Sequence, residues 1–592
     1  MNPHLGKILV FWLQTVTAIG LCLWVGFEYS LPLISSAAIT VCILSAPSAG
    51  SVFSKSKWRF MGTLAGGTVI AFLALWFAQA PWLFLLGLAV WTGICSYISA
   101  HFRYFQAYAA ALSGYTATII LVEIHDHFSL VAFSTVQRVA EICLGVACVA
   151  LVFGLTHIRK GIRRLEPEMH LLGKRTLDIT RSILDTPSRR HVVEQLREWA
   201  RQTENLQHNL LLVGEEEGIL ARQSKSIRTA LSDLYGPLTY FCDALLALGQ
   251  AKNTAEVIAA KACVIDCLTQ LTQAHNDAQA VRLIMDEQLP VLSKALNCAA
   301  ASIDDSLRQS RILAIRPAMT TLLQSLLDYR KVRHDPLASP VRATGKQLIE
   351  RKIAIFQAIG VAIGYLAFCW FWIESGWESG DVGLLMFVAI SMIQMASDKP
   401  VLNLLDMLYG LCFAVLVALP LKFIVLPMGS GFGWLMLCTA IGMLPGCAFK
   451  TLPAKASVGS GYLMFFALLM GFDDLSSYDM QETMNQIVAM CISIFAAIVL
   501  MAAVHPWRAQ SRLRMMLKEA RHDFNQTVSS LHRGDTLAMA QWEDRQFLRL
   551  LQLDHVTLLP TPALADRAAD NLLRQCSILR NRYPHSTSSI GT

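Results

Sequence analysis

Apolar positions in this chain are gathered into two blocks of long runs, and a charged stretch separates them. The stretch from Ile158 to Glu350 has the apolar spacing of amphipathic helices and contains no apolar run long enough to cross a bilayer. The two flanking blocks resemble each other. The pattern predicts an all-α integral membrane protein in which two membrane halves flank a soluble helical insert.

A membrane-spanning helix needs about 20 mainly apolar residues, within a range of about 17 to 25. Each block contains six candidate segments. Those of the first block are Ile8–Phe27, Leu31–Pro47, Trp58–Ala78, Trp82–Ser99, Phe105–Val122 and Phe133–His157, and those of the second are Ile353–Ile373, Val382–Ala396, Val401–Leu426, Phe432–Phe449, Ser457–Phe472 and Gln486–His505. The second segment of each block is short or bounded by proline. In transporters such a segment indicates a substrate path, and simple tilt of the helix is the alternative.

These segments define four regions of the chain. They are a first six-helix transmembrane half (residues 1–157), a cytoplasmic helical domain (158–350), a second six-helix transmembrane half (351–505) and a cytoplasmic helical tail with a disordered end (506–592). Turn residues predict breaks in the insert near Thr186-Pro187, Gly236-Pro237 and Ser339-Pro340. Because both are amphipathic, we expect the insert and the tail to pack together.

Composition supports a membrane protein and argues against other classes. The chain has 592 residues, of which 54% are hydrophobic and only 16% are charged. Its net charge of +7 lies at the ends of apolar segments and in the insert, without the basic and aromatic interleaving of a nucleic-acid groove. The 15 cysteines show no C-x-x-C spacing. We therefore expect the lipid bilayer as a partner, and no nucleic acid, disulfide framework or zinc ribbon.

Charges between the apolar segments alternate in sign along the chain. The positive group comprises Lys55, Lys57, Arg59, Arg103, Arg159, Lys160, Arg163, Arg164, Arg351, Lys352, Lys399, Lys450, Lys455, Arg508, Arg512 and Arg514. The negative group comprises Glu28, Glu123, Asp126, Glu374, Glu378, Asp381, Asp473, Asp474, Asp479 and Glu482. By the positive-inside rule, both termini and the insert are predicted to be cytoplasmic. Arg138 and Lys422 break this pattern near outer helix ends.

Short sequences recur between the two blocks at a constant distance. Ser113-Gly114-Tyr115 recurs as Ser460-Gly461-Tyr462. Gly62 recurs as Gly410, Cys143 as Cys491 and His157 as His505, with shifts of 347 or 348 residues. Matches spread over several helices in the same order predict an internal repeat. Because each half begins and ends on the same side, the axis relating them should run along the membrane normal.

Sequence motifs of enzymes and cofactor sites are missing from the chain. It contains no phosphate-binding loop, no G-x-S-x-G elbow and no H-E-x-x-H helix. The sets Glu123, His125, Asp126 and His127, and Cys263, Cys267 and His275, resemble metal ligands only loosely, and a solvated loop and an ordinary helix face explain them better. We expect no enzymatic activity, no metal and no cofactor.

Two groups of residues are candidates for substrate binding or coupling. Arg138 and Glu141 are three residues apart in the sixth segment, where they form either a proton or anion relay or a structural ion pair. The second group is Arg59, Tyr115, Ser460 and Tyr462, in which Arg59 supplies a charge and the repeated Ser-Gly-Tyr supplies a hydroxyl, close backbone approach and a ring. The alternative is that the repeated glycines and tyrosines serve only helix packing.

Several local sequences resemble a known family. Ala46-Pro47-Ser48-Ala49-Gly50, Arg59-Phe60-Met61-Gly62-Thr63, and the set Arg138, Glu141 and Gly145 match the pattern of the fusaric acid resistance and aromatic acid exporter family. The resemblance covers nearly the whole chain, because members also have two six-helix halves split by a cytoplasmic region.

The resemblance implies a component of a bacterial inner-membrane efflux pump. Such a component works with a periplasmic adaptor and an outer-membrane channel. It exports small organic anions, namely aromatic carboxylic acids such as hydroxybenzoates or fusaric acid. An aromatic carboxylate needs a cation for its charge and aromatic or small apolar surface for its ring. We expect the proton gradient to drive it. A passive organic-anion channel and a membrane scaffold with a partner-binding cytoplasmic domain are the alternatives, and the sequence leaves open whether the protein forms a homo-oligomer.

Overall fold

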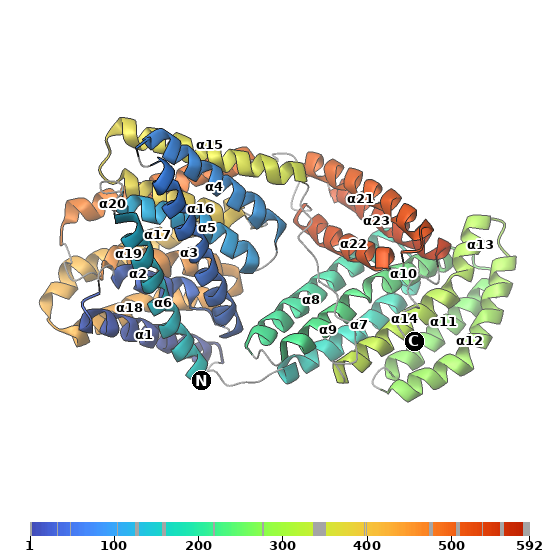
Figure 1. Ribbon diagram of the computed structural model, residues 1–592. Coiled ribbons are helices and arrows are strands. Elements are labelled where there is room, and N and C mark those ends of the chain that lie inside the picture. Colours follow the sequence, from blue (N-terminus) through green and yellow to red (C-terminus); the bar gives the residue numbers. More distant parts are fainter. Residues whose placement is uncertain are drawn as a thin grey trace. The chain divides into compact units, whose positions relative to one another are not determined.

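The chain folds into helices that gather in two compact units (Figure 1). The computed structural model describes residues 3–31, 34–47, 49–77, 79–102, 105–124, 130–156, 162–216, 220–274, 277–334, 351–395, 397, 400–472, 478–504, 509–535, 537–556 and 562–583, and all regular structure in them is helical. The apolar unit comprises Met1–Arg159 and Arg351–Trp507. The polar unit comprises Lys160–Glu350 and Arg508–Thr592.

The described residues of the apolar unit form twelve α-helices. Those of the first segment are α1 (Pro3–Glu28), α2 (Ile34–Leu44), α3 (Ala49–Phe77), α4 (Pro81–His101), α5 (Phe105–Ile124) and α6 (Val131–Thr156), and those of the second are α15 (Arg351–Ser375), α16 (Gly380–Met395), α17 (Pro400–Pro420), α18 (Phe432–Thr451), α19 (Ala456–Met470) and α20 (Met480–Val504). Within the described ranges, nine are long and apolar enough to span a membrane, and α2, α16 and α19 are shorter. A helix lies in each predicted range.

The largest difference from the predicted bounds is at α3, which begins at Ala49 instead of Trp58. Two cations between these positions, Lys55 and Lys57, lowered the apparent hydropathy, but no proline lies between Pro47 and Trp58 to stop the helix. Arg59 therefore does not open α3. It lies ten residues after Ala49, which is about 15 Å along the helix axis.

Helix pairs in the apolar unit approach closely at glycines. A Cβ atom added to Gly62 of α3 would lie 2.6 Å from the Ala109 carbonyl oxygen of α5, and one added to Gly410 of α17 would lie 2.7 Å from the Val458 carbonyl oxygen of α19. Only a residue without a side chain allows the backbones to approach to this distance. The packing role predicted for Gly62 is confirmed at this position.

Contacts within the apolar unit also join its two chain segments. α4 packs on α15, and α1 packs on α18; likewise α5 packs on α16, and α2 packs on α19. The fourth helix of each segment thus packs on the first helix of the other segment, and the fifth helix of each packs on the second helix of the other. The core of the unit is thus built jointly by both segments.

The polar unit is a bundle of amphipathic helices around one apolar helix (Figure 1). Its α-helices are α7 (Glu166–Asp185), α8 (Arg189–Glu216), α9 (Ala221–Ser232), α10 (Tyr235–Gly249), α11 (Ala255–Gln273), α12 (Ala278–Ala301), α13 (Ser306–Leu313), α14 (Ile315–His334), α21 (Ala509–His532), α22 (Leu537–Val556) and α23 (Pro562–Arg582), and a 3-10 turn lies at Ile162–Leu165. Every residue of α10 is buried. A helix that is apolar on all sides is stable only when others surround it, and α10 contacts α7, α14 and α23 among others.

The break predicted near Gly236-Pro237 is confirmed slightly earlier in the chain, since α9 ends at Ser232 and α10 begins at Tyr235. Gly236 and Pro237 lie inside the first turn of α10, because proline is tolerated where the backbone N–H has no helical partner. Gly236 also makes room for the Glu543 side chain of α22, since an added Cβ atom would lie 2.1 Å from its carboxyl carbon. The break at Thr186-Pro187 is confirmed, between α7 and α8.

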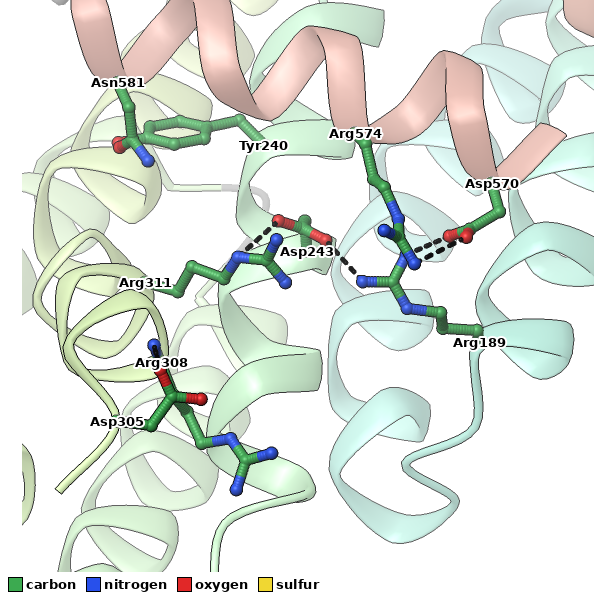
Figure 2. Close-up of polar contacts among 9 residues, drawn as sticks. All are labelled: Arg189, Tyr240, Asp243, Asp305, Arg308, Arg311, Asp570, Arg574 and Asn581. Carbon is green, nitrogen blue, oxygen red and sulfur yellow. Dashed lines mark hydrogen bonds and ion pairs between the residues drawn. The ribbon is translucent and has the colours of Figure 1, made fainter. Parts of the chain in front are cut away.

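The tail packs on the insert through ion pairs as well as apolar contacts. Arg189 of α8 contacts Asp570 of α23, and it lies 3.9 Å from Asp243, a buried residue of α10 (Figure 2). The other oxygen of Asp243 lies 3.8 Å from Nε of Arg311 (Figure 2). In the same unit, Arg580 donates two hydrogen bonds, of 2.6 and 2.8 Å, to Glu543. The predicted packing of tail on insert is therefore confirmed.

Some predicted features lie outside the described residues. They are the break at Ser339-Pro340, the loop residues His125, Asp126 and His127, the residue His275, the repeated pair His157 and His505, and several charges used for orientation, namely Arg103, Arg159, Lys160, Lys399, Asp473, Asp474 and Arg508.

Candidate functional site

Arg59 is the centre of a buried polar cluster in the apolar unit. Only 2% of its surface is exposed. Its Nη1 atom donates to the hydroxyl groups of Tyr108 at 2.7 Å and Tyr115 at 3.3 Å, and its Nη2 atom donates to the Thr40 hydroxyl at 3.1 Å. Three helices, α2, α3 and α5, thus supply the cluster. Two candidates that the sequence named separately, Arg59 and Tyr115, are in direct contact.

The close packing of α3 on α5 explains how this contact forms. Arg59 and Gly62 are three residues apart and therefore share one face of α3. The close approach at Gly62 brings α5 against this face. Tyr108 and Tyr115 are seven residues apart, which is about two helical turns, so both rings lie on the side of α5 that faces Arg59. The glycine in α3 thus determines the geometry of the charged cluster.

Arg59 has no carboxylate partner among the described residues. Its Nε atom is buried and has no hydrogen-bond acceptor in this part of the chain. Arg580 shows how the same edge of a guanidinium binds a carboxylate, since its Nε and Nη2 atoms donate to the two oxygens of Glu543. A buried charge inside an apolar unit is costly unless it is paired. The Nε and Nη2 edge of Arg59 therefore has the geometry to bind an anion.

A second polar cluster surrounds Arg138 of α6. Its Nη1 atom donates to Glu141 at 3.2 Å, lies 4.0 Å from a carboxylate oxygen of Glu123 of α5, and also donates to the Ser36 hydroxyl. Gln137 donates to the other oxygen of Glu141 at 3.0 Å. The pairing of Arg138 with Glu141 is as expected from their spacing, and Glu123 is a further member. Two carboxyl groups share one guanidinium, which can balance the negative charge of only one of them.

A third buried cation, Lys450 of α18, is 8% exposed. Its Nζ atom donates to the Cys42 carbonyl oxygen at 3.2 Å. This carbonyl belongs to the last turn of α2, where backbone oxygens lack helical partners and the helix dipole favours a cation. Lys55, which lies one turn before Arg59 on α3, repels the charge of Lys450. No carboxylate pairs with Lys450 within the described ranges.

The short helix α2 contacts three of the four cations that are buried in the described part of the apolar unit, and Lys422 is the fourth. Ser36 accepts from Arg138, Thr40 from Arg59 and the Cys42 carbonyl from Lys450. These positions are spread over roughly 9 Å of helix axis at about 1.5 Å per residue. The short second helix α2 thus contacts buried cations from α3, α6 and α18, and a substrate path along it remains a prediction.

The two remaining candidates, Tyr462 and Ser460, have different surroundings. Tyr462 is fully buried, its hydroxyl donates to the Gly442 carbonyl at 2.6 Å, and its ring stacks on Phe466 at 5.9 Å between centroids. Ser460 is exposed on α19. The described structure does not bring either residue to the Arg59 cluster. A substrate role for Ser460 and Tyr462 remains a prediction.

Sequence reasoning missed several members of these clusters. Thr40, Tyr108, Glu123 and Lys450 come together through contacts between helices far apart in the chain, which residue spacing does not reveal. The sequence nevertheless contained a signal for Lys450. This residue follows Cys447 by three positions and Gly442 by eight, which is helical spacing and predicts that it lies on the same face of α18 as these two residues. Among the described residues, no group of three or more histidine, cysteine or acidic side chains could hold a metal ion.

Comparison with known proteins places these features in a family. Residues 8–583 match the fusaric acid resistance protein family. The p-hydroxybenzoic acid efflux pump subunit AaeB of Pectobacterium parmentieri (strain WPP163) is 22% identical over 457 residues, which cover 75% of this chain and 66% of the relative. The subunit of the same name from Yersinia pestis (strain Pestoides F) is 26% identical over 455 residues, which cover 72% of this chain and 65% of the relative.

The match spans just under two thirds of the length of these relatives. No solved structure matches the chain significantly. The apolar helices together with the efflux relatives indicate a multi-pass membrane protein. Because the match to the family extends over nearly all of the sequence, the chain belongs to the fusaric acid resistance protein family.

Proposed function

We propose that this chain is an inner-membrane efflux transporter for aromatic carboxylic acids or related organic anions. The observation that carries the proposal is Arg59, a buried cation without a carboxylate among the described residues. The relatives are named for p-hydroxybenzoic acid, which combines a carboxylate with a small ring. A site for such a molecule requires a cation for the charge and apolar or aromatic surface for the ring.

In this proposal the substrate carboxylate binds the Nε and Nη2 edge of Arg59. Tyr108 and Tyr115 hold Nη1 and so fix the plane of the guanidinium. The substrate takes the place of the Thr40 hydroxyl on Nη2 and adds an acceptor for Nε. Since Nε is buried, the anion reaches it only when α2 moves away from α3. The described conformation then corresponds to a state closed around Arg59.

Coupling to the proton gradient would involve the Arg138 cluster. A proton bound by Glu123 or Glu141 neutralises that carboxylate and weakens its ion pair with Arg138. Arg138 also donates to Ser36, four residues before Thr40 on α2. A shift of Arg138 therefore moves the helix that covers Arg59. This link by one rigid helix is the proposed route from proton to substrate.

The wider arrangement completes the proposal. The two segments of the apolar unit would be six-helix repeats, which the reciprocal contacts of α4 on α15 and α1 on α18 support. Both termini and the polar unit would be cytoplasmic, in keeping with the alternation of charges. A periplasmic adaptor and an outer-membrane channel would complete a three-part pump, as the name of the relatives as pump subunits suggests.

Uptake of labelled p-hydroxybenzoate into inside-out vesicles tests the proposal. Arg59→Gln should lower the rate roughly 10- to 100-fold, because a hydrogen-bonded charge contributes about 1.5–3 kcal/mol. Arg59→Lys should be similarly impaired, since an ammonium lacks the planar fork that binds two tyrosines on one side and both oxygens of a carboxylate on the other. The control is Lys57→Gln, which removes an exposed cation from the same helix. It should leave the rate unchanged.

The outcomes separate the proposal from its alternatives. Wild-type uptake by Arg59→Gln at normal abundance would refute the anion site. Uptake that an uncoupler does not change would favour a passive channel. Complete lack of uptake by the wild-type protein for a panel of aromatic acids would favour a scaffold that binds a partner.

A further inference from the structure

A small cavity lies in the polar unit between α7, α11, α12 and α14. It offers about 40 Å³ to water-sized groups, which is room for about three of them. Its wall is mainly apolar and includes Leu177, Leu271, Val281, Leu323 and Leu326. Such a wall suits the carbon part of a ligand better than it suits water.

Two arginines of α14 also line this cavity. Arg330 and Arg333 are three residues apart and lie on the same face. The Nη1 atom of Arg330 and the Nε atom of Arg333 are buried and lack a hydrogen-bond partner within the described residues. Burial lowers the pKa of Arg330, and the nearby Arg333 charge lowers it further, whereas Asp277 opposes the shift. Two cations that repel each other thus both have an N–H group without an acceptor.

The other described residues that line the cavity do not accept a hydrogen bond from these two N–H groups. Tyr329 is buried beside the arginines, and its hydroxyl already donates to the Met169 carbonyl at 3.3 Å. Gly173 of α7 also lines the cavity, and a Cβ atom added to it would meet no atom within 4 Å. The cavity therefore combines free donors, an apolar wall and unfilled space next to Gly173.

We propose that this cavity binds a small organic monocarboxylate. The carboxylate accepts hydrogen bonds from Arg330 and Arg333, and the adjoining carbon atoms lie against the leucines. A carboxylate has three heavy atoms, which corresponds to the space for about three water-sized groups. A ring attached to it extends toward the mouth of the cavity. The site is distinct from the Arg59 cluster, and the inference does not depend on the proposed transport function.

Hydrogen–deuterium exchange of the full-length protein in detergent tests this inference, because it localises binding within the chain. Benzoate should slow the exchange of amides in Met169–Leu177 and Leu323–Arg333, whereas acetate and inorganic phosphate should do so only weakly. In Arg333→Gln, half-maximal protection should need at least about tenfold more benzoate, since a charge-assisted hydrogen bond is lost. The control Arg282→Gln removes an exposed cation of α12 and should behave as wild type.

A second variant keeps the arginines and fills the space. Gly173→Leu should abolish the protection by benzoate while leaving exchange without ligand as slow as in wild type, because no atom stands in the way of its Cβ. Protection that survives both Gly173→Leu and Arg333→Gln would overturn the inference. Equal protection by phosphate and benzoate would overturn the assignment to an organic carboxylate.

Discussion

Replacing Gly236 with alanine should disrupt the buried ion pair between Glu543 and Arg580 in the polar unit. The added Cβ atom would lie 2.1 Å from the carboxyl carbon of Glu543 and 2.1 and 2.2 Å from its oxygens. These distances are far shorter than any stable contact, so Glu543 must move. Its hydrogen bonds to Arg580 are then lost. Because both side chains are less than one tenth exposed, water cannot replace these bonds.

The magnitude follows from two opposing effects. Breaking a buried ion pair costs about 3–5 kcal/mol. Alanine in place of glycine returns up to about 1 kcal/mol through the reduced entropy of the unfolded chain. The net loss of stability should be about 2–4 kcal/mol, which accelerates exchange of the α10 amides by roughly 30- to 700-fold. Hydrogen–deuterium exchange of α10 peptides in the purified protein measures it.

Two comparisons make this prediction refutable. Gly173→Ala lies in a helix of the same unit where an added Cβ meets nothing, so it should stabilise by about 0.5–1 kcal/mol. In a Glu543→Ala background, Gly236→Ala should cost almost nothing more, because the clashing group is gone. Wild-type exchange in Gly236→Ala, or equal costs in both backgrounds, would show that the carboxylate does not occupy the space beside Gly236.

Three further predictions concern the apolar unit. Glu123→Gln should reduce uptake driven by an imposed pH gradient as strongly as Glu141→Gln does, about tenfold or more, and an unaffected Glu123→Gln protein would restrict the proton site to Glu141. Tyr115→Phe should lower transport, because its hydroxyl accepts from a charged group, whereas Tyr462→Phe should cost only about 0.5–1.5 kcal/mol of stability measured by thermal unfolding. Reporter fusions after Arg514 should indicate the cytoplasm and those after Glu378 the periplasm, and the reverse result would invert the proposed orientation.

The helices could be predicted from the sequence because their signals are local. Apolar runs of sufficient length, proline positions and charged flanks each lie within about 20 residues, so a helix occurs in every predicted range of the apolar unit. The error at the start of α3 has the same origin. Lys55, Lys57 and Arg59 read as a polar flank, whereas Arg59 is a buried residue of the helix.

The clusters were predictable only as far as their contacts are local. Arg138 and Glu141 pair as their spacing of three residues implies. Glu123 and Ser36 join them from other helices, and no local pattern in the sequence indicates this. Arg59 and Tyr115 were both candidates, but their contact depends on the approach of α5 at Gly62. Lys450 counted only as an inner charge, although it is buried against α2.

The charged clusters are distributed unequally over the two segments of the apolar unit. A shift of 348 residues relates Arg59 to Met407, Arg138 to Gln486 and Glu141 to Ala489. A second buried guanidinium without a carboxylate would add the free-energy cost of burying another unpaired charge. The second segment has instead an apolar side chain at the position of Arg59, and its repeated tyrosine binds a backbone carbonyl.

The second segment nevertheless contributes a charge from another position. Lys450 of α18 contacts the same helix, α2, on which Arg59 and Arg138 converge. The repeat proposed above thus provides a symmetric scaffold, and substitutions within it place three of the four buried cations of the described apolar unit around one short helix, Lys422 being the exception. A helix that contacts three charges changes the environment of each when it moves. In the proposed mechanism this asymmetry would make α2, rather than its proposed counterpart α16, the element that couples a proton to an anion.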